Sequence, residues 1–96
     1  MAKTVTVEDI PDVETLPGYK ALTPVHKLRP SKATRIMAAV REDDPAAEQA
    51  AAVVEAVEEY AVEDEARWAK VFADEGVQGV ITLAMAYLVK LVGGND

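Results

Sequence analysis

The chain has 96 residues and a formal net charge of -7, with 17 Asp and Glu residues against 10 Lys and Arg residues. A chain this acidic is poorly suited to neutralise nucleic-acid phosphates over a broad surface, and the absence of cysteine excludes disulfides and thiolate metal sites. Hydrophobic residues make up 50 % of the chain but aromatic residues only 5 %, so the apolar content is mostly Ala and Val, which suits closely approaching helices.

The N-terminal residues 1–23 do not follow a helical pattern. The stretch TVTV at 4–7 alternates as a short strand does, and Pro11, Pro17 and the turn signal PGY interrupt it. We therefore expect residues 1–23 to form an extended and partly flexible arm with room for one short strand. Such a strand could pair with a neighbouring subunit and make the protein a homo-oligomer.

A helical domain is expected over residues 24–96. Ser31 is the expected N-cap of a first helix, in which apolar residues recur at spacings of three and four. Asp43 or Asp44 is the expected cap of a second helix with Pro45 in its first turn, and Gly76 suits a helix end. The pattern predicts helices over about 31–42, 45–62, 64–75 and 78–92. The predicted fold is mainly α, a small bundle of three to four helices with an extended N-terminal arm.

The last predicted helix is apolar almost all round, so it should be central in the bundle or covered by another chain. No apolar run reaches the roughly 20 residues that a membrane span needs, and residues 1–12 lack the apolar core of a signal peptide. We expect a protein of the cytoplasm that does not bind membranes.

No set of residues in the sequence is typical of a catalytic or metal site. His26 is the only histidine, and neither VEDE nor REDD has the alternating ligands and turn glycine of a calcium loop. The sequence thus predicts no enzyme activity and no cofactor.

Positive charge is concentrated in KLRPSKATR, which contains Lys27, Arg29, Lys32 and Arg35. The following run from Glu42 to Glu65 contains ten carboxylates and no Lys or Arg. Two interpretations stay open for the cations. In a helical hairpin they could form ion pairs with glutamates of that run (Glu48, Glu55, Glu59), or they could make polar contacts with a partner.

The phrase PVHKLRPS at 24–31, between an extended arm and an acidic, Ala-rich middle followed by an apolar last helix, resembles the tail assembly chaperones of long-tailed actinobacteriophages. The resemblance spans most of the chain from about Tyr19. It implies a non-enzymatic protein of the host cytoplasm, absent from the mature virion. Such a protein binds the tape measure protein, with the tail tube protein as a further partner, while the tail tube assembles.

A chaperone for an amphipathic helical client needs an apolar surface of adaptable side chains. In the last predicted helix the candidates for client binding are Val80, Ile81, Ala84, Met85 and Leu88. The same residues would serve an ordinary helical core. A different class of function is also open, namely a small acidic regulator or antitoxin-like inhibitor that covers a basic protein surface with its Glu42–Glu65 run.

Overall fold

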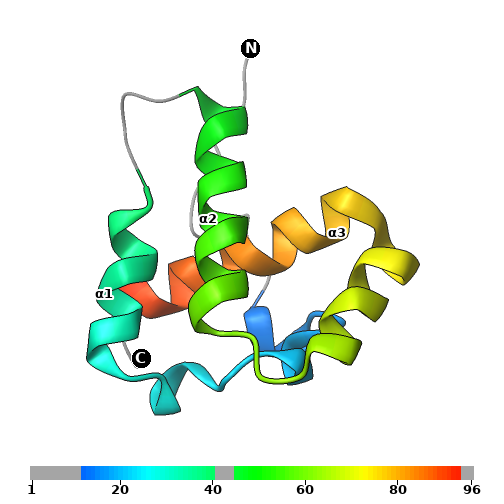
Figure 1. Ribbon diagram of the computed structural model, residues 1–96, viewed down its shortest axis with the longest axis horizontal. Helices are drawn as coiled ribbons and strands as arrows, with labels where there is room; N and C mark the ends of the chain where they lie inside the picture. Colours follow the sequence, from blue (N-terminus) through cyan, green and yellow to red (C-terminus); the bar gives the residue numbers. More distant parts are fainter. Residues whose placement is uncertain (1–11, 41–44, 94–96) are drawn as a thin grey trace.

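The computed structural model describes residues 12–40 and 45–93. Within these residues, three short 3₁₀ turns precede three α-helices, which confirms a mainly helical fold (Figure 1). The turns are η2 (Val13–Thr15), η3 (Tyr19–Ala21) and η4 (Val25–Lys27), and the helices are α1 (Pro30–Ala38), α2 (Ala46–Tyr60) and α3 (Glu65–Gly93). In Figure 1, α2 stands beside α1, and the second half of α3 crosses behind α2.

The starts of α1, α2 and α3 each differ from the expected ones by one residue. Ser31, predicted as the N-cap of the first helix, lies inside the first turn of α1, and Arg29 occupies the cap position without a side-chain cap bond. The reason is Pro30, whose fixed φ and missing N–H suit the first helical position. Pro45 is the cap of α2 rather than a residue of its first turn. Asp43 and Asp44, the predicted cap residues, lie outside the described residues.

A break at Gly76 divides α3 into a first limb (residues 65–75) and a second limb (residues 77–93). Gly76 has φ 76° and ψ -177°, a backbone conformation that is essentially restricted to glycine. The two helices expected over 64–75 and 78–92 thus correspond to the two limbs of one bent helix.

The core lies where α1, α2 and the second limb of α3 meet. Its largest fully buried side chains include Tyr87, Ile36 and Leu83, with Val53 and Val57 contributed by α2. Among the described residues, no charged side chain is buried. The second limb is therefore central, as its apolar composition predicts.

The described part of the expected arm does not lie free. Val13, Ala21 and Leu22 are buried against α3 and the rest of the core. Backbone hydrogen bonds also join it to the α2–α3 connection, with the Thr23 N–H donating to the Ala61 carbonyl at 2.7 Å and the Glu63 N–H to the Ala21 carbonyl at 2.8 Å. This segment is a packed layer of the fold, and the predicted TVTV strand lies outside the described residues.

By length and composition alone, α3 is also able to cross a membrane. Its first limb carries charges of both signs, however, and the uncharged run is only 76–89, which is shorter than a span needs and typical of a buried core helix. The bend at Gly76 and the burial of Leu83, Ala84 and Tyr87 agree with a helix that serves the core.

Candidate functional site

An apolar groove of about 440 Å³ opens between α2 and the two limbs of α3. One side of this α2–α3 groove comes from α2, the opposite side from the first limb, and the inner end from the start of the second limb (Figure 1). Its lining residues are Ala47, Ala50, Ala51, Val54, Glu55, Glu58, Trp68, Phe72, Val77, Val80 and Ile81.

The α2 side of the groove is built from small side chains. Ala47, Ala50, Ala51 and Val54 recur at spacings of three and four, so they share one face of the helix. Because alanine leaves the helix backbone near the surface, a second helix could pack closely against this face. The α2 side therefore favours a helical ligand.

The α3 side of the groove is formed by large apolar side chains that remain open to solvent. Phe72 is 56 % exposed and Val77 is 59 % exposed. Trp68 and Val71 of the first limb are buried, whereas Phe72 lines the groove. The groove thus places two exposed large apolar residues beside an alanine face.

A hydrogen bond links the two sides of the groove at its base. The indole Nε1–H of Trp68 donates to the Glu58 carboxylate Oε2 at 2.8 Å. This bond holds one carboxylate in place at the edge of the groove, and it gives the nearly buried indole its polar partner.

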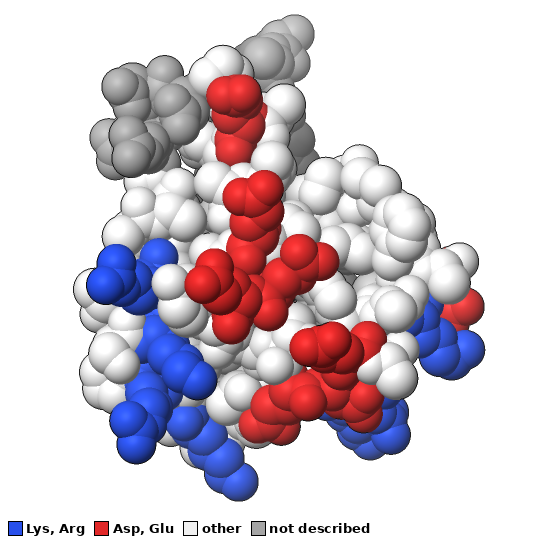
Figure 2. Space-filling model, viewed as in Figure 1, with Lys and Arg blue, Asp and Glu red and all other residues white. Residues whose placement is uncertain are grey.

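Negative charge follows the α2 edge of the groove. Glu55 and Glu58 line it, and Figure 2 shows acidic side chains continuing along α2 toward the α2–α3 connection. Among its lining residues none is Lys or Arg. The groove thus combines an apolar interior with one acidic edge, which suits an apolar ligand surface flanked by positive charge.

The structure divides the predicted client-binding residues into two groups. Val80, Ala84 and Leu88 are buried in the core of the chain itself, whereas Ile81 and Met85 are only partly buried. Val80 and Ile81 line the groove. The predicted face is therefore mostly a core face, and only its N-terminal end contributes to an open surface.

The predicted polar contacts are all exposed: Lys27 lies on η4, Arg29 directly before α1, and Lys32 and Arg35 on α1. Figure 2 shows Lys and Arg side chains gathered on the flank of the molecule that α1 occupies in Figure 1, beside acidic side chains over α2. The expected ion pairs with α2 glutamates are not formed. Within residues 12–40 and 45–93 the ion pairs are Arg67–Asp64 and Lys70–Asp74, each at 3.1 Å. Exposed ion pairs contribute little to the stability of a protein. The contact between α1 and α2 is instead made by apolar residues, and the four cations remain in solvent.

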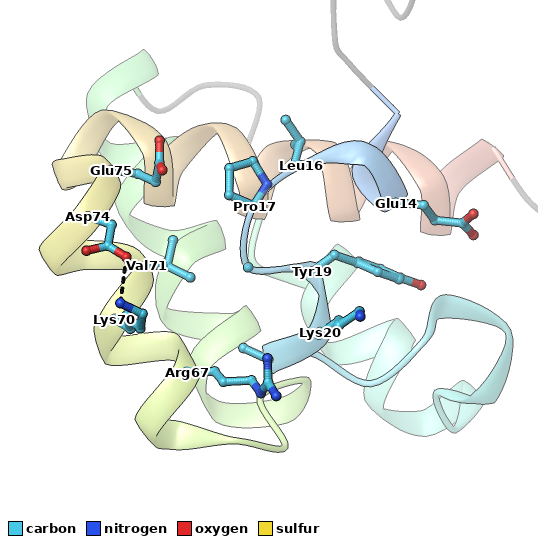
Figure 3. Close-up of a pocket in the computed structure, with 12 residues that line it drawn as sticks. Glu14, Leu16, Pro17, Tyr19, Lys20, Arg67, Lys70, Val71, Asp74 and Glu75 are labelled. Carbon is cyan, nitrogen blue, oxygen red and sulfur yellow. Dashed lines mark ion pairs between the residues drawn. The ribbon is translucent and has the colours of Figure 1, made fainter.

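A second pocket, of about 370 Å³, lies between residues 14–21 and the first limb of α3 (Figure 3). Its α3 side carries Arg67 and Lys70, and both already have an ion-pair partner: Arg67 pairs with Asp64, just before α3, and Lys70 pairs with Asp74 of the same helix. Lys20 also lines the pocket, and the carboxylates of Glu14, Asp74 and Glu75 balance these three cations. The pocket therefore lacks the excess positive charge that would hold an anionic ligand.

In the part of the chain that the structure describes, no group of three or more His, Asp or Glu side chains is placed to hold a metal ion. His26 is exposed on η4. The chain matches no protein-family model, no curated protein and no solved structure. The features of the described residues that bear on function are therefore the α2–α3 groove and the charges around it.

Most of this groove is not predicted by the sequence pattern. Its α2 side consists of alanines, which a search for large apolar residues passes over. One signal was present in the sequence, because Ala47, Ala50, Ala51 and Val54 form a second apolar face on α2 beside the core face of Val53 and Val57. A helix with two apolar faces indicates a second packing partner.

Proposed function

We propose that the protein is a phage tail assembly chaperone that binds the tape measure protein and keeps it soluble during tail tube assembly. The observation that carries the proposal is the α2–α3 groove, an open apolar surface with Phe72 and Val77 more than half exposed. Exposed apolar patches of this kind are typical of interaction sites. A long helical client offers the apolar stripes that such a groove can cover.

The charge of the chain supports the same proposal. A net charge of -7 on 96 residues keeps a small protein dispersed, and it would do the same for a complex with an aggregation-prone client. In this proposal the protein is not an enzyme and acts in the host cytoplasm, with the tail tube protein as a secondary partner, and it leaves before the virion is complete. The exposed cations Lys27, Arg29, Lys32 and Arg35 would contact acidic segments of these partners or of a second copy of the chain.

The test is co-expression of the chain with the tape measure protein of the same phage. The soluble fraction of the tape measure protein and its co-purification with the tagged chain are measured for the wild type and for a Phe72→Ser, Val77→Ser variant. A matched control, Met37→Ser with Val92→Ser, removes two exposed apolar side chains that do not line the groove.

We expect the wild type and the control to hold the tape measure protein in solution, and the groove variant to lose it. Both variants should remain folded, because all four side chains are at least 43 % exposed. A tape measure protein that stays insoluble with the wild-type chain, or that binds both variants equally well, would contradict the proposal.

A second function is favoured by one separate observation. Glu48, Glu55 and Glu59 follow one outward ridge of α2 at spacings of seven and four, and Figure 2 shows this acidic surface continuing toward the start of α3. Such a ridge could cover a basic protein surface, as an acidic regulator or antitoxin-like inhibitor does. In that case Gln at Glu55, Glu58 and Glu59 would abolish binding to the basic partner, while Ser at Phe72 and Val77 would leave it unchanged.

A further inference from the structure

The shape of the α2–α3 groove limits what can occupy it. Residues 47–58 of α2 rise by about 17 Å along the helix axis, which corresponds to about three turns of a partner helix. All lining residues belong to helices, whose backbone groups bond within the helix, so an extended peptide would find no strand edge to pair with. A helix carries its own backbone hydrogen bonds into the groove and needs only side-chain contacts.

The charge of the groove is asymmetric across its width. Glu55 and Glu58, three residues apart, stand on the α2 edge, and the opposite edge carries the uncharged Phe72 and Val77. The Trp68 indole N–H holds only Oε2 of Glu58, which leaves the second carboxylate oxygen able to accept a hydrogen bond from a partner. A helix seated here would meet negative charge along one flank only.

We propose that the α2–α3 groove selects an amphipathic helix of about three turns whose apolar stripe is bordered by Lys or Arg on the flank that faces α2. This inference rests on the proposed function, since it specifies the chemistry of the client segment. It adds a sequence criterion, because segments of the tape measure protein with acidic residues on both flanks are excluded from the groove. Like charges at the α2 edge would oppose them.

The fluorescence of Trp68, the only tryptophan of the chain, can report whether the α2–α3 groove is occupied. Trp68 lines the groove, so a peptide without tryptophan that binds there should change the emission of Trp68. We would use three labelled peptides of about 18 residues, or five helical turns, that share one leucine stripe. Their flanking positions carry Lys, Gln or Glu. Fluorescence anisotropy of the label provides a second measurement that does not depend on Trp68.

We expect the Lys-flanked peptide to bind about three- to tenfold more tightly than the Gln-flanked peptide, as two partly exposed charge pairs allow. The Glu-flanked peptide should bind most weakly. These differences should shrink at about 0.5 M salt, because exposed charges are then screened.

Two pairs of variants locate the effect. Glu55→Gln with Glu58→Gln should remove the preference for Lys and keep the binding of the Gln-flanked peptide, since an amide oxygen can still accept from Trp68. Its control, Glu48→Gln with Glu59→Gln, changes the net charge equally on residues of α2 that do not line the groove, and should retain the preference. Phe72→Ser with Val77→Ser should weaken all three peptides, whereas Met37→Ser with Val92→Ser should weaken none.

Equal binding of the three peptides, no binding of any, or a preference for Lys that survives Glu55→Gln with Glu58→Gln would overturn the inference. These results would leave the proposed function intact if the tape measure protein still co-purified with the chain. In the reverse outcome, the chain prefers the Lys-flanked peptide but does not co-purify with the tape measure protein. That result would refute the proposed function and still support an amphipathic helix with Lys or Arg on one flank as the ligand. Circular dichroism of each variant excludes loss of fold as the cause.

Discussion

The hydroxyl of Tyr87 donates a hydrogen bond of 2.6 Å to the backbone carbonyl of Thr23, which lies 64 positions earlier in the chain. Tyr87 is fully buried on the second limb of α3. Because the Thr23 N–H donates to the Ala61 carbonyl at the end of α2, one short stretch of chain connects α2 with α3. This connection explains why the described part of the N-terminal segment is packed.

Tyr87→Phe should lower the free energy of unfolding by about 1 to 2 kcal/mol, since it removes the partner of a partly buried carbonyl. Urea denaturation of the variant measures the loss. Tyr60→Phe is the matched control, because Tyr60 is only half-buried and its hydroxyl makes no hydrogen bond within the described residues. Equal losses in the two variants would contradict a role for the Tyr87–Thr23 bond.

Alkaline pH should destabilise the protein through the same residue. Burial raises the pKa of the Tyr87 hydroxyl well above its ordinary value, and the nearby Tyr19 and Glu63 act in the same direction. The unfolded chain ionises this group near its usual pKa of about 10, so the stabilisation is complete below that pH and declines as the pH rises further.

The urea midpoint of the wild type should therefore fall more steeply between about pH 9 and 11 than that of Tyr87→Phe, which has no phenol to ionise. Deprotonation of lysines affects both proteins and cancels in the comparison. Parallel curves would show that the hydroxyl of Tyr87 does not control this part of the pH dependence.

Gly18→Ala should be among the most destabilising single changes in the chain. Gly18 has φ 92°, and a Cβ atom there would overlap the Val71 side chain and approach Leu83 Cδ2 at 3.1 Å. The backbone strain and the clash together should cost more than about 2 kcal/mol. In a urea-denaturation cycle, Val71→Ala should recover part of the loss, and simple additivity of the two changes would contradict the clash.

Gly76→Ala tests backbone strain alone, because a Cβ atom at Gly76 would meet no atom within 4 Å. Its φ of 76° and ψ of -177° should cost about 1 to 3 kcal/mol for alanine. Gly93→Ala is the control, since it too has free space and lacks a positive φ. The Gly76 variant should also bind the Lys-flanked peptide more weakly, because relief of the strain would move the first limb away from α2.

Much of the fold could be predicted because it follows from local patterns. The spacing predicts an apolar face on α2 made of Ala46, Ala50, Val53, Val54, Val57 and Ala61, and of these Val53, Val57 and Ala61 are buried. Gly76 is visible in the sequence as an interruption between two apolar runs. Both features depend on residues within a few turns of each other.

The packing of residues 12–29 could not be predicted in the same way. Three 3₁₀ turns of three residues each have no period to detect, and the burial of Val13 and Leu22 depends on contacts with α3 far along the chain. The groove was missed for a similar reason, because it arises where three helical segments meet. Tertiary packing decides which of the two apolar faces of α2 remains open to solvent. In the second limb of α3, most of the residues predicted to bind a client are buried in the core instead.

The bend at Gly76 also sets the size of the molecule. A straight helix of 29 residues would measure about 43 Å, whereas the longest dimension of the protein is 39 Å. Without the bend, the end of α3 would project beyond the body of the protein, and Phe72 and Val77 would lie along a rod with no facing surface. The torsion of one glycine therefore turns the apolar side chains of the first limb toward α2, and the α2–α3 groove depends on that single residue.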